Sequence, residues 1–533
     1  MRTKEQTYPD FSAELEALRD GGFTVELLQK IIEKHQANAG YNRKLYERYQ
    51  ALDSCVPIFE RIPRFEGDEE PINNKINNDF FGEIVDFKTG YFAGKAIGYS
   101  YSRGDEIEDA TGSKAATQEA SKALTDFVVR NNMYDKDTEL TKNAAIYGYS
   151  GRLFYIDPDG NERCLVVPGY ETIVLSGTDI TEPEYGVRYY STTDMDGNER
   201  WKVEFYDEKT VRYFSGELSN LSESEPEQAH MFDSCPLQGI PNNKELIGDA
   251  EKVVSLIDAY DRTVSDNSND IESFSSAYMV FENVMLDENE MQKAQHSGAI
   301  QFNSTNGGKV YYLTKDVNDT FTENHLKRLE NNIYRFSKTP NLSDEKFGEA
   351  SGISLKFKLT GLETKCGMFQ AKMVSAGNYM FKLLASSWAK KRIAVDPLQC
   401  YMDFQRNFPL DIISEAQAVQ AMIASGLPKE IAYDQYSFVD DLDYVMQLID
   451  DEKNGIPSLL DDDVEADGNQ ATDSDLNKAS STILNGAQIT ALTGIIQQVQ
   501  AGVLSREAAI NITTSALGVP RESAEMMIEE KSS

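Results

Sequence analysis

The sequence is poor in the residues that metal and redox chemistry require. It holds four histidines and five cysteines among 533 residues, and no two of them have the spacing of a zinc site. An odd number of isolated cysteines argues against a disulfide scaffold and favours a reducing compartment. The five are Cys55, Cys164, Cys235, Cys366 and Cys400.

Long apolar runs are also missing. The first twenty residues lack the apolar core of a secretory signal, and no later stretch approaches the roughly 20 apolar residues that span a bilayer. The chain is nevertheless 40% apolar and 10% aromatic, so it can bury substantial cores. At roughly 150 residues per domain, its length predicts several domains. We therefore expect a soluble, intracellular, multidomain protein with no membrane partner.

Basic residues are also few relative to acidic ones. The sequence has 52 Lys and Arg residues and 88 Asp and Glu residues, which gives a formal net charge of −36. Such a surface as a whole should not attract nucleic acid or anionic lipid. One stretch departs from this balance, because residues 323–392 carry thirteen basic and six acidic side chains. This basic strip predicts either salt bridges with the acidic helix expected at 245–272 or a light contact with a polyanion.

The motifs of common enzyme active sites are absent or incomplete. The run GYFAGKA (90–96) is one residue short of a phosphate-binding loop, and Ala96 stands where that loop needs a hydroxyl. The acidic run that begins at Asp463 resembles a calcium loop, but its twelfth position is Ser474 and not the bidentate Glu. No Ser nucleophile elbow occurs, and the carboxylates are too many for any pair to stand out as acid and base. The residues therefore predict no enzyme, no metal site and no cofactor.

Periodicity divides the first half of the chain into helical and strand-forming parts. Apolar residues at helical spacing predict helices in three stretches, at 11–62, 80–94 and 114–147. Within the first stretch, Gly40 is expected to end a helix. From about 150 to 235, short runs of β-branched and aromatic residues predict strands. The pentapeptide DGNER, at 159–163 and 196–200, predicts two hairpin turns built on Asp-Gly.

The second half begins with an acidic helix. Residues 244–274 contain no proline and predict one helix of about 30 residues, whose acidic outer face is explained most simply by solvation. Residues 276–315 form an insert with strand-like ends, and the helix that follows stops at Pro340. Residues 342–352 are rich in turn formers and predict a loop. A very long helix is then expected to reach about Arg392.

Four stretches carry a further signal because they occur together and in a fixed order. They are KINNDFFGEIVDFKTGYFAGKAIGY (75–99), the segment around NNKELIGDAEKVVSLIDAYDRTVSDNSND (236–281), TPNLSDEKFGEASGISLKFKLTGLETK (339–365) and FQRNFPLDIISEA (404–416). In this combination, which spans most of residues 75–450, the chain resembles bacteriophage portal proteins of the kind used by siphophages of Gram-positive hosts. Residues 455–533 lie outside the resemblance.

The resemblance implies an α+β fold, a mainly helical multidomain portal fold with wing, stem, clip and crown regions. The wing would contain a β-rich portion, and the clip would be a small α/β unit. On this sequence the regions would be the wing at 1–240, with N-terminal helices and the β-rich part at 150–235; stem helices at 241–275 and 322–341; the clip at 276–321; a tunnel loop at 342–352; a long wing helix at 353–408; crown helices at 409–454; and an acidic linker with a helical tail at 455–533.

The resemblance also implies which residues would meet DNA. The tunnel loop would project towards the duplex, and its residues are Ser343, Asp344, Glu345, Lys346, Phe347, Gly348, Glu349, Ala350, Ser351 and Gly352. The acidic stem helix would line or back the channel, with carboxylates at Asp249, Glu251, Asp258, Asp261, Asp266 and Asp270. A surface rich in carboxylates and sparing in cations would let DNA slide without adhering.

The function that the resemblance implies is a conduit without catalysis. Portal proteins form rings, here expected to have twelve subunits, through which double-stranded DNA enters and leaves a capsid at one vertex. The expected partners are terminase, a major capsid or scaffold protein and a head–tail adaptor protein, with assembly in the host cytoplasm and a final place in the virion. Two alternatives stay open: another phage structural or adaptor protein without a DNA channel, and a metal-dependent nuclease or hydrolase that uses some of the carboxylates.

Overall fold

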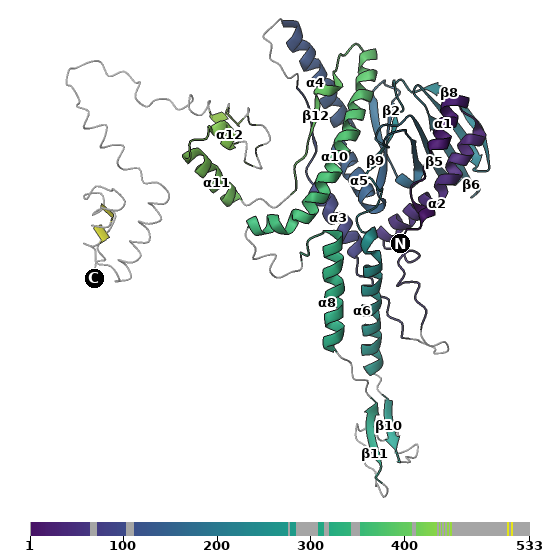
Figure 1. Ribbon diagram of the computed structural model, residues 1–533, viewed down its shortest axis with the longest axis vertical. Helices are drawn as coiled ribbons and strands as arrows, with labels where there is room; N and C mark the ends of the chain where they lie inside the picture. Colours follow the sequence, from purple (N-terminus) through teal and green to yellow (C-terminus); the bar gives the residue numbers. More distant parts are fainter. Residues whose placement is uncertain are drawn as a thin grey trace. The chain divides into compact units, whose positions relative to one another are not determined.

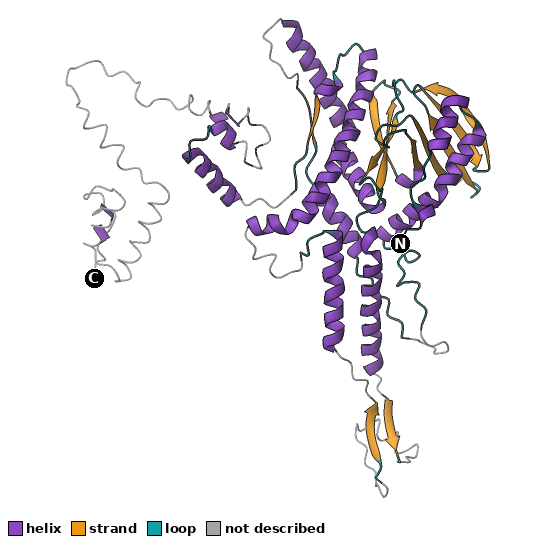
Figure 2. Ribbon diagram, viewed as in Figure 1, coloured by secondary structure: helices purple, strands orange, loops and turns teal. Residues whose placement is uncertain are grey.

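The computed structural model describes residues 2–63, 72–102, 111–193, 195–275, 278–283, 307–313, 319–342, 352–407 and 412–433, with some isolated residues between 436 and 514. The chain divides into two compact units, Met1–Ser425 and Gly426–Ser533. The helix α12 (Lys429–Tyr433) belongs to the second unit. The other elements named below belong to the first unit and are drawn in Figures 1 and 2.

Helices form the N-terminal part, as the apolar periodicity predicts. They are α1 (Ser12–Gly21), α2 (Val25–Tyr49), α3 (Phe80–Ala93), α4 (Thr111–Asn131) and α5 (Met133–Tyr147). The Thr24 side chain caps α2 by accepting a hydrogen bond from the Leu27 N–H at 3.2 Å. The expected helix end at Gly40 is wrong, because α2 continues to bury Asn42 and Leu45 in its next turns. That packing outweighs the weak helix propensity of glycine.

The β-rich region contains two antiparallel sheets, with strand orders β3–β2–β9 and β4–β5–β6–β7–β8. The strands are β2 (Tyr149–Ile156), β3 (Glu162–Val167), β4 (Thr172–Leu175), β5 (Tyr185–Thr193), β6 (Glu199–Tyr206), β7 (Thr210–Glu217), β8 (Asn220–Ala229) and β9 (Leu237–Pro241). The two DGNER segments join β2 to β3 and β5 to β6, so both predicted hairpin turns are confirmed. Their glycines, Gly160 and Gly197, have φ angles of +81° and +84°, which other residues rarely adopt.

The five-stranded sheet packs against the first two helices. Figure 1 shows α1 and α2 lying over this sheet. Leu15 of α1 and Leu28 and Ile31 of α2 share one buried cluster with Val187 and Phe205 of the sheet. Val187 and Tyr189 of β5, and Val203 and Phe205 of β6, are buried at alternate positions, as the period of two predicts.

Two long helices, α6 (Val254–Ser275) and α8 (Asp319–Ser337), lie side by side (Figure 1). Ile257 lies near the start of α6 and Ile333 near the end of α8, and both belong to one core cluster. The helices are therefore antiparallel. The second helix was predicted over 322–341; it starts three residues earlier and ends four residues earlier.

The helix predicted over 244–274 is wrong at its start. α6 begins at Val254, after one 3-10 turn, and residues 242–250 form a loop. Leu246 has a φ of +54°, outside the helical region. The backbone at Gly248 lies so close to the carbonyl oxygen of Ile146 that a Cβ would clash with it, and this close packing requires glycine. Both features interrupt a helix that local periodicity alone would continue.

The insert between α6 and α8 contains β10 (Tyr278–Glu282) and β11 (Lys309–Leu313), which pair antiparallel. They match two of the strand-like runs in the sequence; the third, at 298–302, lies outside the described residues.

After α8 comes α10 (Gly352–Lys390), which confirms the very long helix expected to reach about Arg392. The helix does not extend to residue 408, the end given for the long wing helix, because a turn and a strand occupy 391–403. The chain then turns into β12 (Cys400–Asp403), which pairs with β1 (Gly98–Tyr101). Gly377 allows this strand to lie close to α10, because a Cβ there would clash with the Met402 sulfur. The helix α11 (Ile412–Ala424) closes the first unit. This mixture of helices and sheets confirms the predicted α+β class, and no described helix has the length and apolarity to cross a membrane.

Candidate functional site: the helix pair and its buried polar base

The predicted tunnel loop lies almost entirely outside the described residues. Residues 343–351 belong to that part of the chain, and Gly352 is the first residue of α10. Residues 343–351 follow α8 and precede α10 in the sequence. The helix pair itself is described, and it carries most of the carboxylates that the sequence singled out.

Asp249 is not on the helix but in the loop before it, where it is the centre of a buried ion cluster. Its carboxylate lies 2.8 Å from Lys88 Nζ and 2.7 Å from Lys365 Nζ, and both Asp249 and Lys88 are almost completely buried. Burial alone would raise the pKa of Asp249, but the two ammonium groups lower it below its usual value. Burial lowers the pKa of Lys88, and Asp249 opposes that effect. Lys365 also donates to the carbonyl of Ser337 at 2.8 Å, so the cluster joins α3, α8 and α10.

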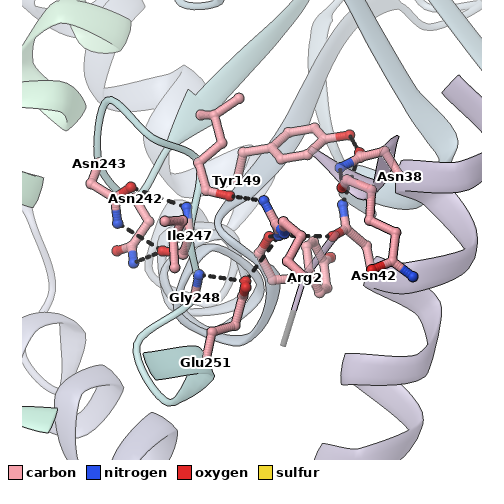
Figure 3. Close-up of polar contacts among 12 residues, drawn as sticks. Arg2, Asn38, Asn42, Tyr149, Asn242, Asn243, Ile247, Gly248 and Glu251 are labelled. Carbon is pink, nitrogen blue, oxygen red and sulfur yellow. Dashed lines mark hydrogen bonds and ion pairs between the residues drawn. The ribbon is translucent and has the colours of Figure 1, made fainter. Parts of the chain in front are cut away.

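Glu251 is buried beside Arg2, as Figure 3 shows. The Arg2 guanidinium lies 2.9 Å from Glu251 Oε1 and donates to the carbonyls of Leu246 at 2.7 Å and Tyr147 at 3.4 Å. It also donates to Asn42 Oδ1 of α2 at 3.3 Å. Arg2 therefore ties the loop before α6 to α2 and to the end of α5. No sequence pattern indicated this role, because the partners lie up to 249 positions away.

The loop before α6 supplies its own polar partners as well (Figure 3). The Asn242 and Asn243 side chains donate to the Ile247 carbonyl at 2.9 and 2.7 Å, and Asn243 Oδ1 accepts from the Ile247 N–H. Glu251 Oε1 accepts from the Gly248 N–H at 2.9 Å. These bonds hold a largely buried loop whose backbone groups a helix would otherwise satisfy.

Three carboxylates further along α6 face the N-terminal region of the chain. Asp258 pairs with Arg48, and Asp266 pairs with Arg61. Asp261 accepts from the backbone and side-chain nitrogens of Asn78 at 2.8 and 3.0 Å. Burial raises the pKa of Asp261, since its partners are amides and not cations.

Residues 72–79, which form no helix or strand, run along this same side of α6. The Ile76 N–H donates to Ser265 Oγ at 3.0 Å, and the Asn74 N–H donates to Asn269 Oδ1 at 2.6 Å. The sixth carboxylate, Asp270, is partly exposed. The acidic face of α6 is thus largely covered by the chain's own cations and amides, so simple solvation does not describe it.

The basic strip at 323–392 meets the acidic segment at one described point, the pair of Lys365 and Asp249. Three other lysines of the strip pair elsewhere, at 2.6–2.8 Å: Lys372 with Asp179, Lys390 with Asp233, and Lys391 with Glu162. The cations of α8 and its C-terminal end are exposed and have no ion pair with any described residue: Lys327, Arg328, Arg335 and Lys338.

The described residues contain no group of three or more His, Cys, Asp or Glu side chains that could hold a metal ion. The calcium-like run at 463–474 lies outside them. His35 is completely buried between the hydroxyls of Tyr149 and Tyr189, at 2.9 Å from each. Burial lowers its pKa to about 3, so it is a neutral core residue. All five cysteines are described and unpaired.

Comparisons with known proteins all point to the same family. The profile of the family described as "Phage portal protein, SPP1 Gp6-like" matches residues 28–457, which run from α2 past α12. The portal protein of Clostridium phage phiCD119 is 21% identical over 421 residues, covering 74% of this chain and 89% of that protein. The portal protein of Bacillus phage SPP1 is 23% identical over 445 residues, covering 76% and 83%.

Proposed function

The chain belongs to the SPP1 Gp6-like family of phage portal proteins, and we propose that it forms a ring of twelve subunits around a channel for double-stranded DNA at one capsid vertex. Portal proteins are virion components that serve genome packaging, and their family is structural. We attribute ATP hydrolysis during packaging to a separate terminase, because no complete phosphate-binding motif occurs in the sequence.

The antiparallel pair of α6 and α8 is our candidate for the stem. What supports this assignment is the way the pair is anchored, with the ion cluster of Lys88, Asp249 and Lys365 and the Arg2–Glu251 pair at its base. A DNA conduit under packaging forces needs a stem that does not rotate freely against the rest of the subunit. Buried ion pairs provide such a geometric constraint, since breaking one leaves a buried charge uncompensated.

The remaining regions follow from this assignment. The insert with β10 and β11 would be the clip, which would contact a head–tail adaptor protein. The N-terminal helices, the two sheets and α10 would be the wing, which would face the capsid or scaffold protein. Residues 343–352 would be the tunnel loop, and the residues beyond 409 would form the crown. Terminase would dock on the assembled ring, and assembly would take place in the host cytoplasm.

The mass of the purified full-length chain tests this proposal most simply. Light scattering coupled to size-exclusion chromatography should give a mass near twelve times 59.8 kDa, and negative-stain images should show rings with a central hole. A species that stays monomeric or dimeric under all assembly conditions would refute the channel and favour an adaptor protein without one.

A further inference from the structure

The rotation of α8 about its own axis is fixed by the residues that it buries. Leu329, Ile333, Tyr334 and Ser337 are buried on one side of the helix. The Tyr334 hydroxyl donates to the Glu83 carboxylate of α3 at 2.8 Å, which holds this side in place. The other residues of α8 must then project away from the core in an order set by the helix period.

The exposed side of α8 is strongly cationic. At about 100° per residue, six exposed residues fall within an arc of about 100°: Thr320, Asn324, Lys327, Arg328, Asn331 and Arg335. Lys338 is exposed immediately beyond the helix end. Glu323 and Glu330 lie outside the arc. We call Lys327, Arg328, Arg335 and Lys338, with the two interleaved asparagines, the cationic face.

The helix dipole explains only part of this face. Cations are favourable in the last turn of a helix, which accounts for Arg335 and Lys338. Lys327 and Arg328 stand about two and a half turns before the end, where the dipole effect has faded. None of the four cations has an ion pair with a described residue, whereas Arg48, Arg61 and Lys365 each pair with a carboxylate of the acidic segment.

We propose that the cationic face contacts the phosphate backbone of a DNA duplex in the channel. This inference rests on the proposed portal function. Lys, Arg and Asn side chains donate hydrogen bonds to phosphate oxygens, and such contacts do not depend on the base sequence. Lys327 and Arg335 are about 12 Å apart along the helix, which is the rise of three to four base pairs. The rest of the chain is strongly acidic, with a net charge of −36 overall, so each subunit would make few phosphate contacts. Few contacts can break as the DNA moves.

A neighbouring copy of the chain fits the cationic face less well. Stable protein interfaces have an apolar or aromatic centre, and the arc contains none. Exposed aromatic rings of α8 lie beside the arc, at Phe321 and Phe336, which are 71% and 56% exposed. A subunit contact would use that neighbouring side. DNA is therefore the occupant that the charge pattern favours.

The salt dependence of DNA binding by the assembled full-length ring tests the proposal. The quadruple variant Lys327→Gln, Arg328→Gln, Arg335→Gln and Lys338→Gln should bind a fluorescent 30-base-pair duplex at least tenfold more weakly at about 50 mM salt. Its log–log salt slope should also become shallower, by about 0.9 for each phosphate that the ring no longer neutralises. The matched control removes four exposed lysines elsewhere: Lys30, Lys122, Lys202 and Lys209. Equal binding by both variants would overturn the proposal.

Crosslinking distinguishes DNA from a neighbouring subunit as the partner of the cationic face. A photoreactive residue in place of Asn331, at the centre of the face, should crosslink the duplex, and the same residue in place of His325, exposed outside the arc, should not. Covalent subunit dimers from position 331, or failure of the quadruple variant to form rings while the control variant forms them, would assign the face to a subunit contact and overturn the proposal. If the wild-type chain forms no ring, the portal function itself fails. If it forms rings that crosslink no DNA at 331, only the inference about the cationic face fails.

Discussion

The two helices of the antiparallel pair use their charges in opposite ways. α6 is rich in carboxylates, yet Asp258, Asp261 and Asp266 bind Arg48, Asn78 and Arg61 of the same chain. α8 carries cations that are exposed and have no ion pair among the described residues. The formal charge of a helix therefore does not indicate which of its charged side chains are available to a partner. Their availability depends on which of them already form ion pairs or hydrogen bonds within the subunit.

Because the charges of α6 are paired and those of α8 are exposed, substitutions on the two helices should affect different properties, the stability of the subunit and the binding of a partner. Removing one member of a buried pair leaves the other charge in a poorly solvated place, which is strongly destabilising. Removing an exposed cation changes the folding free energy very little. Substitutions of the buried charges at the base of α6 should therefore destabilise the subunit, and substitutions of the exposed cations of α8 should change only what the ring binds.

The largest effect is expected for Asp249→Asn. Two buried ammonium groups would then lack their common carboxylate, so the free energy of unfolding should fall by about 3–5 kcal/mol. Urea unfolding followed by circular dichroism measures this loss. The control is Glu245→Gln, an exposed residue of the same loop. A loss below about 1 kcal/mol would mean that the cluster does not anchor the helix pair.

A smaller loss is expected for Arg2→Ala. The change removes the cation beside buried Glu251 and a donor to the Leu246 carbonyl, so we expect about 2–3 kcal/mol from these charge-assisted hydrogen bonds. Lys4→Ala, an exposed cation two residues away, is the control. Thermal unfolding of the two variants should differ clearly; identical midpoints would show that the N-terminal arm does not hold the loop before α6.

The pH dependence of stability should distinguish carboxylates bound by cations from those bound by amides. The pKa of Asp249 is lowered in the folded chain, so its contribution is present above the unfolded pKa near 4 and is lost as the pH falls through the folded value. The pKa of Asp261 is raised, so its contribution is present at low pH and is lost as the pH rises through the folded value.

Relative to wild type, Asp249→Asn should therefore become less destabilising as the pH falls from 7 to 3, and Asp261→Asn should become more destabilising. Urea midpoints across that range measure both trends. Slopes of the same sign for the two variants would contradict the distinction between their partners.

The smallest effect is expected on the other helix. Arg328→Gln and Lys327→Gln should each change the free energy of unfolding by less than about 0.5 kcal/mol, because both side chains are exposed and have no ion pair among the described residues. Calorimetry of the single variants checks this. A loss above about 1 kcal/mol would reveal a structural role for the cationic face and would erase the contrast with α6.

Features with a local cause could be predicted from the sequence. Helical periodicity located α3 and α10, and the Asp-Gly pairs located two hairpin turns, because each depends on residues within a few positions. The order of four stretches then indicated the portal family, and the comparisons confirm that membership.

Features with a distant cause could not be predicted. The true start of α6 depends on the left-handed Leu246 and on the close approach of Gly248 to Ile146, which lies far earlier in the chain. The role of Arg2 and the pairing of β1 with β12 likewise join residues far apart in sequence. The expected acidic lining of the channel, and the tunnel loop at 343–352, remain predictions. For the lining, the structure adds that most of those carboxylates already have partners.

The most direct test is a cryo-electron microscopy map of the assembled full-length protein with a short duplex inside. Our account predicts a closed ring in which Lys327, Arg328 and Arg335 of every subunit point into a channel wide enough for DNA. A map in which these side chains face the outer surface, or a protein that forms no ring, would contradict it.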